Sequence, residues 1–283
     1  MKYVIIGNSI AATACIEGIR SVDKEGGIAV ISAENYPVYG RPLISYCLLV
    51  RVKRENMGYR PDDFYGKNDV SVYYGRTATK IDAAAKKVIL DNGKEIEYEK
   101  LLAATGSRPF VPPMQGLDGV KDKFSCMTMD DMLALEGALS PEKDVLVIGA
   151  GLIGLKCVEG ILHLAKSVTV VDMADRILPS ILDSEGSALV QRGLEEKGVK
   201  FFLSDSAEKF DGNTAYLKNS KKKIDFDILV VAVGVRPNTD LVKEAGGEVN
   251  RGIVVDKGMH TSIPDVYLSL IHISEPTRLD VMS

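Results

Sequence analysis

Two stretches of the sequence share one pattern, in which an apolar run leads into a turn of small residues and then into a helical pattern. They are YVIIGNSIAATACIEG, residues 3–18, and VLVIGAGLIGLKCVEG, residues 145–160. A second short apolar run follows each of them, at residues 27–34 and 167–172. A strand, a glycine turn, a helix and a second strand make a βαβ unit, which builds a parallel sheet covered by helices. The sequence therefore predicts an α/β fold with two Rossmann-like dinucleotide-type units.

Further elements are expected around these units. Short apolar or alternating runs predict strands at residues 70–74, 87–90, 94–98, 100–104 and 199–203, and within residues 226–238. Helical patterns cover residues 128–138 and 184–196, and the first of these has Asp130 and Asp131 near its start.

The second glycine turn carries the complete G-x-G-x-x-G pattern, as Gly149, Gly151 and Gly154. In such a turn the first glycine bends the chain, the second lets a pyrophosphate approach the backbone, and the third lets helix and strand pack closely. The phosphate then lies at a helix N-terminus, where free N–H groups and the helix dipole favour an anion. Asp172 ends the next strand, where a carboxylate can accept hydrogen bonds from ribose hydroxyls and favours NADH over NADPH. Arg176 keeps NADPH open, because it could neutralise a 2′-phosphate.

The first glycine turn is degenerate, with Gly7, Ser9 and Ala12 at the three glycine positions. Serine and alanine are small enough for a phosphate to approach, and the Ser9 hydroxyl could add a contact. Glu34, at the end of the second strand, supplies a ribose acid. By itself this turn is equally compatible with a βαβ core that binds no ligand.

Four stretches in a fixed order connect the two turns with a known family. They are YGRPLIS at residues 39–45, LLAATGSRP at 101–109, GAGLIG at 149–154 and LVVAVGVRPN at 229–238. Together they resemble the FAD-dependent pyridine nucleotide-disulfide oxidoreductase family, from residue 2 to about residue 267. The chain is most similar to the branch without a CxxxxC motif, which includes rubredoxin and ferredoxin reductases, NADH oxidases, CoA-disulfide reductases and the flavin region of nitrite reductase.

The resemblance implies an NAD domain inserted in a split FAD domain. Residues 1–112 would form the first part of the FAD domain, residues 113–234 the NAD(P)-binding domain, and residues 235–267 an incomplete return to the FAD domain. The family continues into a strand with an A-x-G-D motif, but residues 268–283 read LSLIHISEPTRLDVMS and lack it. We interpret residues 268–283 as a non-native tail similar to a translated sequencing adapter, so the chain is expected to be a fragment that binds FAD poorly.

The resemblance also implies roles for individual residues. Gly7, Ser9 and Ala12 would lie against the FAD pyrophosphate, with Glu34 on its ribose and Arg41 reaching an FAD phosphate. The remaining implied contacts are Ala78 with adenine, Thr105 and Gly106 with the flavin, Gly149, Gly151, Gly154 and Asp172 with NADH, and Gly234 with its nicotinamide half. For the glycines, tight packing at strand ends is the alternative interpretation.

The implied activity is NAD(P)H:acceptor oxidoreduction, with hydride passing from NADH to FAD and electrons then passing to a redox protein or an attached redox module. Two cofactors carry this chemistry, so no general base is required, and none is assigned among His163, His260 and His272. An alternative is an NADH oxidase or CoA-disulfide reductase that uses Cys47, although Ser45 aligns better with the redox cysteine of those enzymes. Lys156 stands where many family members have a glutamate.

Two further alternatives remain, a non-catalytic NADH-binding redox sensor and a single-nucleotide protein with a vestigial first unit. Turnover and flavin reduction would exclude the sensor.

Composition excludes several classes of partner. The 35 basic and 39 acidic residues give a net charge of −4, so neither nucleic acid nor a membrane is expected as a partner. No apolar run reaches the roughly 18 residues of a membrane span. The cysteines Cys15, Cys47, Cys126 and Cys157 are scattered without CxxC spacing, so neither a metal site nor a local redox disulfide is predicted, and a cytoplasmic location is expected. A homodimer is left open for a longer form.

Overall fold

The computed structural model describes residues 1–269 and 273–274. The chain divides into two compact units. Unit 1 comprises Met1–Gly40, Gly58–Arg108 and Pro237–Ser283, and unit 2 comprises Arg41–Met57 and Pro109–Arg236. Strands β8 (Ser107–Pro109) and β17 (Val235–Pro237) carry two of the crossings between the units and pair with each other. Unit 1 is therefore discontinuous in sequence.

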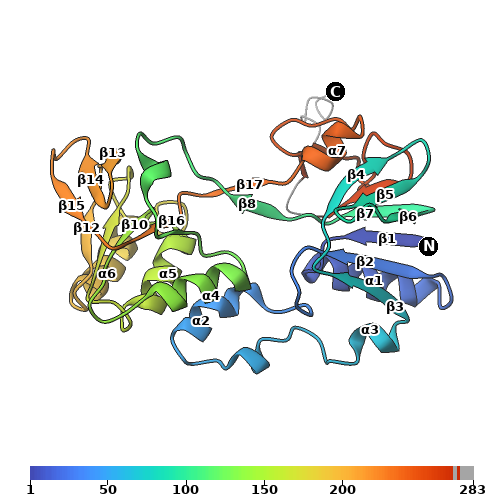
Figure 1. Ribbon diagram of the computed structural model, residues 1–283, viewed down its shortest axis with the longest axis horizontal. Helices are drawn as coiled ribbons and strands as arrows, with labels where there is room; N and C mark the ends of the chain where they lie inside the picture. Colours follow the sequence, from blue (N-terminus) through green and yellow to red (C-terminus); the bar gives the residue numbers. More distant parts are fainter. Residues whose placement is uncertain (270–272, 275–283) are drawn as a thin grey trace. The chain divides into compact units, whose positions relative to one another are not determined.

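Unit 1 is built on a parallel sheet with the strand order β19-β7-β1-β2-β3 (Figure 1). Its strands are β1 (Tyr3–Ile6), β2 (Ile28–Ser32), β3 (Val70–Tyr74), β7 (Lys100–Ala103) and β19 (Val266–Leu268). Helix α1 (Ile10–Val22) connects β1 to β2, and the short helices α3 (Phe64–Lys67) and α7 (Asp240–Glu244) belong to the same unit. An antiparallel sheet is formed by β4 (Ala78–Asp82), β5 (Lys87–Leu90) and β6 (Glu95–Glu97).

Unit 2 repeats this plan with the strand order β12-β11-β10-β16-β9. The strands are β9 (Lys123–Phe124), β10 (Asp144–Ile148), β11 (Ser167–Val171), β12 (Lys200–Phe202) and β16 (Ile228–Val231). Helix α5 (Leu152–Ile161) connects β10 to β11 (Figure 1). The other helices of the unit are α2 (Ile44–Leu48), α4 (Met129–Ala138) and α6 (Ser184–Glu195). A second antiparallel sheet comprises β13 (Ala207–Asp211), β14 (Thr214–Leu217) and β15 (Lys223–Asp225).

The predicted duplication is confirmed in the pairing of the strands. In unit 1, β1 lies between β2 and β7, and in unit 2 β10 lies between β11 and β16, all in parallel register. Helices and a second sheet cover these strands, so their side chains are apolar on both faces. In β1, Ile5 packs with α1 on one face, while Val4 and Ile6 pack toward the antiparallel sheet on the other. This alternation explains why the strands read as nearly continuous apolar runs.

Most of the interpreted tail lies outside the described residues. Leu268 ends β19 and is buried, and residues 273–274 form β20 (Ile273–Ser274), which pairs with β18 (Ile253–Val254). Within residues 1–269 and 273–274, no helix has both the length and the apolar character that crossing a membrane requires.

Candidate functional site

The glycines of the unit 2 turn have different physical roles. A Cβ on Gly149, whose φ is +116°, would lie 2.4 Å from the carbonyl oxygen of Ala232. A Cβ on Gly154 would lie 2.0 Å from the carbonyl oxygen of Gly149. Gly151 differs, because no heavy atom lies within 4 Å of its Cβ position. Packing therefore requires Gly149 and Gly154, whereas Gly151 leaves open space at the start of α5.

The helices that follow the two glycine turns begin without a side-chain cap. Among the described helices of ten or more residues, α4 is capped by Thr128 and α6 by Asp183. By contrast, α1 begins at Ser9 and α5 at Gly151, and neither has a side-chain cap in the described structure. The first N–H groups of a helix need an acceptor, and an anion at this end also interacts favourably with the helix dipole. Both turns thus leave an uncapped helix end, where a bound anion would be favoured.

A cavity of about 730 Å³ in unit 2 brings together four of the predicted site residues, Gly149, Gly151, Asp172 and Gly234. Gly234 has a φ of +127° and accepts a 2.9 Å hydrogen bond from the Phe110 amide. Asp172 and Asp205 are the acids in the lining, and among the described lining residues there is no lysine or arginine. The volume, the open glycine and the uncapped helix fit a bound dinucleotide.

The Asp172 carboxylate is oriented by two backbone amides. One oxygen accepts a 2.5 Å hydrogen bond from the Ala150 N–H and the other a 2.7 Å bond from the Ala174 N–H. The carboxylate therefore lies directly against the glycine turn. The Arg176 guanidinium lies 3.1 Å from the Asp175 carboxylate and 3.5 Å from the carbonyl oxygen of Pro179, which lines the same cavity.

The unit 1 turn repeats the geometry with other residue types. Gly7 has a φ of +110°, and a Cβ there would lie 2.0 Å from the Ala104 carbonyl oxygen. Ser9 is the N-cap residue of α1, and Ala12 is completely buried in the core between α1 and the sheet. Alanine thus fits where the complete pattern has its third glycine. The position of Gly7 is explained by packing alone, with or without a ligand.

A second cavity, of about 270 Å³, lies in unit 1 and includes the predicted residues Gly7, Ala78 and Thr105. The Thr105 hydroxyl donates a 2.9 Å hydrogen bond to the Asn238 carbonyl, and the Asn238 side-chain amide donates a 2.9 Å bond to the Thr105 carbonyl. Gly106, with φ +69°, accepts a 3.0 Å bond from the Asn238 amide. The structure therefore joins two of the motif stretches in one site.

Several residues of this cavity were not assigned a role from the sequence. They are Arg76, Thr77, Arg108, Asn238 and Asp240. The Arg108 guanidinium lies 2.8 Å from the Asp240 carboxylate and 3.2 Å from the Asn238 side-chain oxygen. Arg108 lies in the stretch LLAATGSRP and Asn238 in LVVAVGVRPN, so these motifs are the sequence signal that could have identified both residues. Nothing local in the sequence distinguishes Arg76 or Thr77.

Two other predicted residues have partners of their own. The Glu34 carboxylate accepts a 2.5 Å hydrogen bond from the Tyr39 hydroxyl within unit 1. Arg41 belongs to unit 2, where its guanidinium donates a 3.1 Å hydrogen bond to the Met127 carbonyl. Glu34 and Arg41 therefore lie in different units.

Cys47 lies on α2, where it is buried. Burial raises the pKa of the Cys47 thiol, and the nearby Arg54 guanidinium only partly opposes this effect. Ser45 on the same helix is also buried. Lys156 on α5 forms a 2.5 Å ion pair with Glu159 and lies over the Tyr46 ring, 4.4 Å from its centroid. A buried thiol with a raised pKa is poorly suited to act as a nucleophile.

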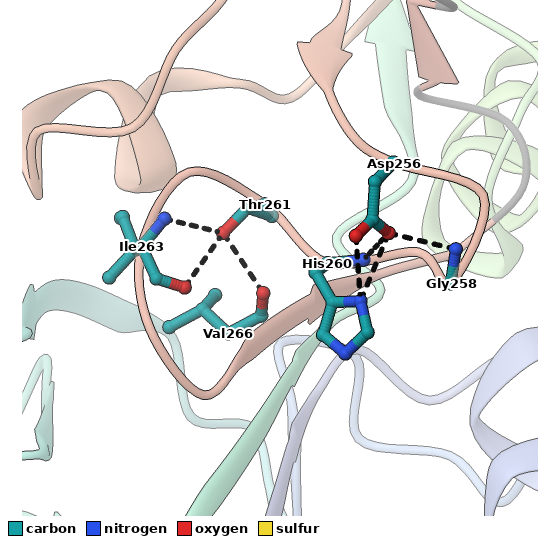
Figure 2. A network of polar contacts seen from close by, with 6 residues as sticks. All are labelled: Asp256, Gly258, His260, Thr261, Ile263 and Val266. Atoms are coloured by element: carbon teal, nitrogen blue, oxygen red, sulfur yellow. Dashed lines mark hydrogen bonds and ion pairs between the residues drawn. The ribbon is translucent and has the colours of Figure 1, made fainter.

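Neither described histidine, His163 or His260, belongs to a group of side chains that could hold a metal. His163 is exposed and His272 lies outside the described residues. Figure 2 shows that His260 belongs to a turn organised by Asp256, whose carboxylate accepts hydrogen bonds from the amides of Gly258 and His260. These amides and the His260 ring, 3.0 Å away, hold the pKa of Asp256 below its usual value. In the described residues, no group of three or more histidine, cysteine or acidic side chains could hold a metal.

The comparisons with known proteins agree with this geometry. Residues 1–269 match the model of the pyridine nucleotide-disulphide oxidoreductase family. A nitrite reductase [NAD(P)H] of Bacillus subtilis is 37% identical over 272 residues, which cover 94% of this chain and 33% of that protein. A rubredoxin-NAD(+) reductase of Pseudomonas putida is 31% identical over 274 residues, covering 94% of this chain and 70% of that one.

A solved structure shows the same fold. A ferredoxin reductase from Rhodopseudomonas palustris superposes with a TM-score of 0.88 at 26% identity, covering 97% of this chain and 69% of that one. The chain spans about a third of the length of the nitrite reductase and just over two thirds of the rubredoxin reductase.

Proposed function

The chain belongs to the pyridine nucleotide-disulphide oxidoreductase family, and from this membership we propose that it binds FAD in unit 1 and NADH in unit 2. The proposed activity is oxidation of NADH, with electrons passing to a redox protein or an attached redox module. The observation that carries the proposal is the repeated site, a glycine turn and an uncapped helix end in each of two parallel-sheet units. The nucleotides, when bound, supply the hydride donor and acceptor.

The residues of the chain would then bind the two nucleotides and hold them in a fixed orientation. The N-termini of α1 and α5 would each hold a pyrophosphate, and Asp172 would accept hydrogen bonds from a ribose. Thr105, Gly106 and Asn238 hold one another by hydrogen bonds and would give the flavin a fixed backbone surface.

The choice of a protein acceptor rests on the relatives. The Pseudomonas putida relative is named for rubredoxin, and the Bacillus subtilis relative is about three times as long as the matched region, which leaves room for further modules. We therefore propose that the acceptor is a small electron-transfer protein or a redox module of the same polypeptide.

The experiment is an anaerobic titration of the flavin-loaded protein with NADH, followed by visible absorption. The expected result is loss of the flavin absorbance band, and its recovery when an oxidised one-electron acceptor such as ferricyanide is added. A protein that binds FAD and NADH without bleaching would overturn the reductase proposal and leave the sensor alternative. Because the chain is expected to bind FAD poorly without the A-x-G-D strand, binding of NADH alone would support the single-nucleotide alternative only if a longer form that includes this strand also fails to bind FAD.

NADH is proposed over NADPH because of the charges around the unit 2 cavity. A 2′-phosphate beside Asp172 would face a carboxylate, with no lysine or arginine among the described lining residues. We predict that Asp172→Asn weakens NADH binding about tenfold, the equivalent of about 1.4 kcal/mol for a hydrogen bond to a charged group. The same change is expected to reduce the discrimination against NADPH. Asp211→Asn, at an exposed position of the same unit, is the matched control.

The dissociation constants of both nucleotides for both variants check this prediction by calorimetry. An unchanged NADH-to-NADPH ratio in Asp172→Asn would place the specificity elsewhere.

Cys47 is expected to take no part in the reaction. We predict that Cys47→Ser leaves the rate of NADH-driven acceptor reduction unchanged, because the thiol is buried and its pKa is raised. Steady-state turnover of the two proteins, at matched flavin content, makes the comparison. A large loss of turnover in the serine variant would favour the cysteine-using oxidase or CoA-disulfide reductase alternative.

A further inference from the structure

The turn that carries the proposed ribose acid is braced by a neighbouring segment of unit 2. In this turn, residues 172–174, one oxygen of the Asp172 carboxylate accepts a 2.7 Å hydrogen bond from the Ala174 N–H. The Asp172 carbonyl oxygen accepts a 3.0 Å bond from the Asp205 N–H. The Ala174 carbonyl oxygen accepts a 2.8 Å bond from the Ser204 N–H. Ser204 and Asp205, the bracing segment, therefore hold the backbone of the turn at both of its ends.

The bracing segment is itself anchored by the Asp205 carboxylate, and Asp205 is only 3% exposed. One carboxylate oxygen accepts 2.8 Å hydrogen bonds from the Ser206 and Asn219 amides, and the other accepts a 3.0 Å bond from the Ser220 amide. Burial by itself would raise the pKa of Asp205, but the hydrogen bonds from these residues outweigh it and lower the pKa to about 2. Asp205 is therefore a charged anchor at neutral pH.

Asn219 links the same two segments a second time. Its side-chain amide donates a 2.6 Å hydrogen bond to the Ser204 carbonyl oxygen. The turn between β14 and β15, which contains Asn219, therefore holds both residues of the bracing segment. Asp172 and Asp205 both line the unit 2 cavity, and all of these contacts lie within unit 2. A continuous set of hydrogen bonds thus leads from the β14–β15 turn to the acid in the cavity.

We propose that Asp205 is a positioning residue, which holds the Asp172 carboxylate in the orientation that binds a ribose hydroxyl and disfavours a 2′-phosphate. This inference rests on the NADH binding proposed for unit 2. Asp205 acts through the backbone, because its carboxylate fixes the bracing segment and that segment fixes the turn at residues 172–174. A hydrogen bond depends on direction, so a carboxylate on a loosened turn makes it in fewer of its conformations.

The Asp205→Asn variant removes the anchor with little change in size. The asparagine amide group replaces one acceptor oxygen by a donor, so three backbone N–H groups face a single acceptor oxygen. At least one of them then loses its partner. The expected result is a dissociation constant for NADH raised about three- to tenfold, together with a smaller preference for NADH over NADPH.

A double-mutant cycle with Asp172→Asn tests whether Asp205 acts through Asp172. In that case Asp205→Asn changes the NADH-to-NADPH affinity ratio of the unaltered protein but has no further effect on the ratio in the Asp172→Asn protein. A residue that only stabilises the fold would leave the ratio unchanged in both. Equal changes in both proteins would mean that the charge of Asp205 acts directly on the nucleotide, and would overturn the positioning role.

Two further variants separate positioning from charge and from stability. Asn219→Ala loosens the bracing segment without changing any charge, and Asn219 is exposed, so this variant tests the proposal even if Asp205→Asn does not fold. A smaller shift of the ratio in the same direction is expected. Asp227→Asn is the matched control, because the Asp227 carboxylate also accepts a backbone bond, from the Asp144 amide at 2.8 Å, but lies outside the cavity lining. Its ratio should stay unchanged.

Calorimetric titration with NADH and NADPH gives the ratios, and hydrogen exchange of the peptide that contains residues 172–175 reports on the turn without a ligand. Faster exchange in Asp205→Asn, together with the shifted ratio, is expected. If the unaltered protein binds NADH and the ratio stays the same in both Asp205→Asn and Asn219→Ala, the inference is wrong. Unchanged exchange in Asp205→Asn overturns the bracing itself. An unaltered protein that binds no NADH instead refutes the function proposed for unit 2.

Discussion

The Gly151→Val variant is expected to lose NADH binding while unit 2 stays folded. Gly151 has φ −78° and ψ −177°, an extended conformation that valine adopts readily, and no heavy atom lies within 4 Å of its Cβ position. The added side chain would occupy the open space in front of the α5 N-terminus, where a phosphate has to approach the N–H groups. We expect the dissociation constant of NADH to rise by at least about tenfold, or 1.4 kcal/mol.

Calorimetric titration with NADH makes the measurement, and circular dichroism with thermal unfolding shows whether the fold is kept. Gly193→Ala is the control, because Gly193 also has open space around its Cβ but lies on α6, outside the cavity lining. Unchanged NADH affinity in Gly151→Val would mean that the phosphates do not bind at this helix end.

Gly154→Ala is expected to destabilise unit 2 itself. The new Cβ would lie 2.0 Å from the carbonyl oxygen of Gly149 and 3.1 Å from its carbonyl carbon. These are backbone atoms of the tight turn, which no side-chain rotation can relieve, so α5 would have to move away from β10. Overpacking of this kind costs about 3 kcal/mol of unfolding free energy, at the upper end of the usual range.

Chemical denaturation of the two proteins gives this difference directly. The control is Gly137→Ala on α4, where no atom lies within 4 Å of the Cβ position. Its stability should stay the same or rise by up to about 1 kcal/mol, because alanine favours a helix over glycine. A Gly154→Ala protein as stable as the unaltered chain would contradict the packing role.

These two variants distinguish the two roles that glycines have in this motif, ligand binding and close packing. Gly151 is open and is expected to matter for the ligand, whereas Gly149 and Gly154 are confined by backbone atoms and matter for the fold. The alternative interpretation of the glycines as packing residues therefore explains Gly149 and Gly154 by itself. It does not explain Gly151.

The predicted fold class was confirmed because it depends on local patterns. Apolar runs, small-residue turns and helical periodicity act over a few residues, and the duplicated βαβ units follow from them. The strand at residues 70–74 and the helix at residues 128–138 were likewise predicted closely, and the structure has them as Val70–Tyr74 and Met129–Ala138. The membership of Arg41–Met57 in unit 2 had no such local signal.

The candidate sites could be predicted only in part. Gly149, Gly151 and Asp172 lie close together in sequence within one βαβ unit, so their grouping in one cavity follows from the motif. Arg76, Thr77 and Asp240 join the unit 1 cavity from segments that local pattern does not connect. The role of Asn238 as the partner of Thr105 is likewise visible only in the folded chain.

The sequence by itself determined that this chain has two dinucleotide-type units, since each glycine turn, its helix and its strands are encoded by contiguous residues. Only the tertiary structure decided which scattered residues meet. Arg108 and Asp240 lie 132 positions apart, and no pattern in the sequence pairs them. Their side chains form a 2.8 Å ion pair because the segments that carry them both fold into unit 1. Such long-range contacts depend on how the sheets and helices pack together, and this packing cannot be predicted from any short stretch of sequence.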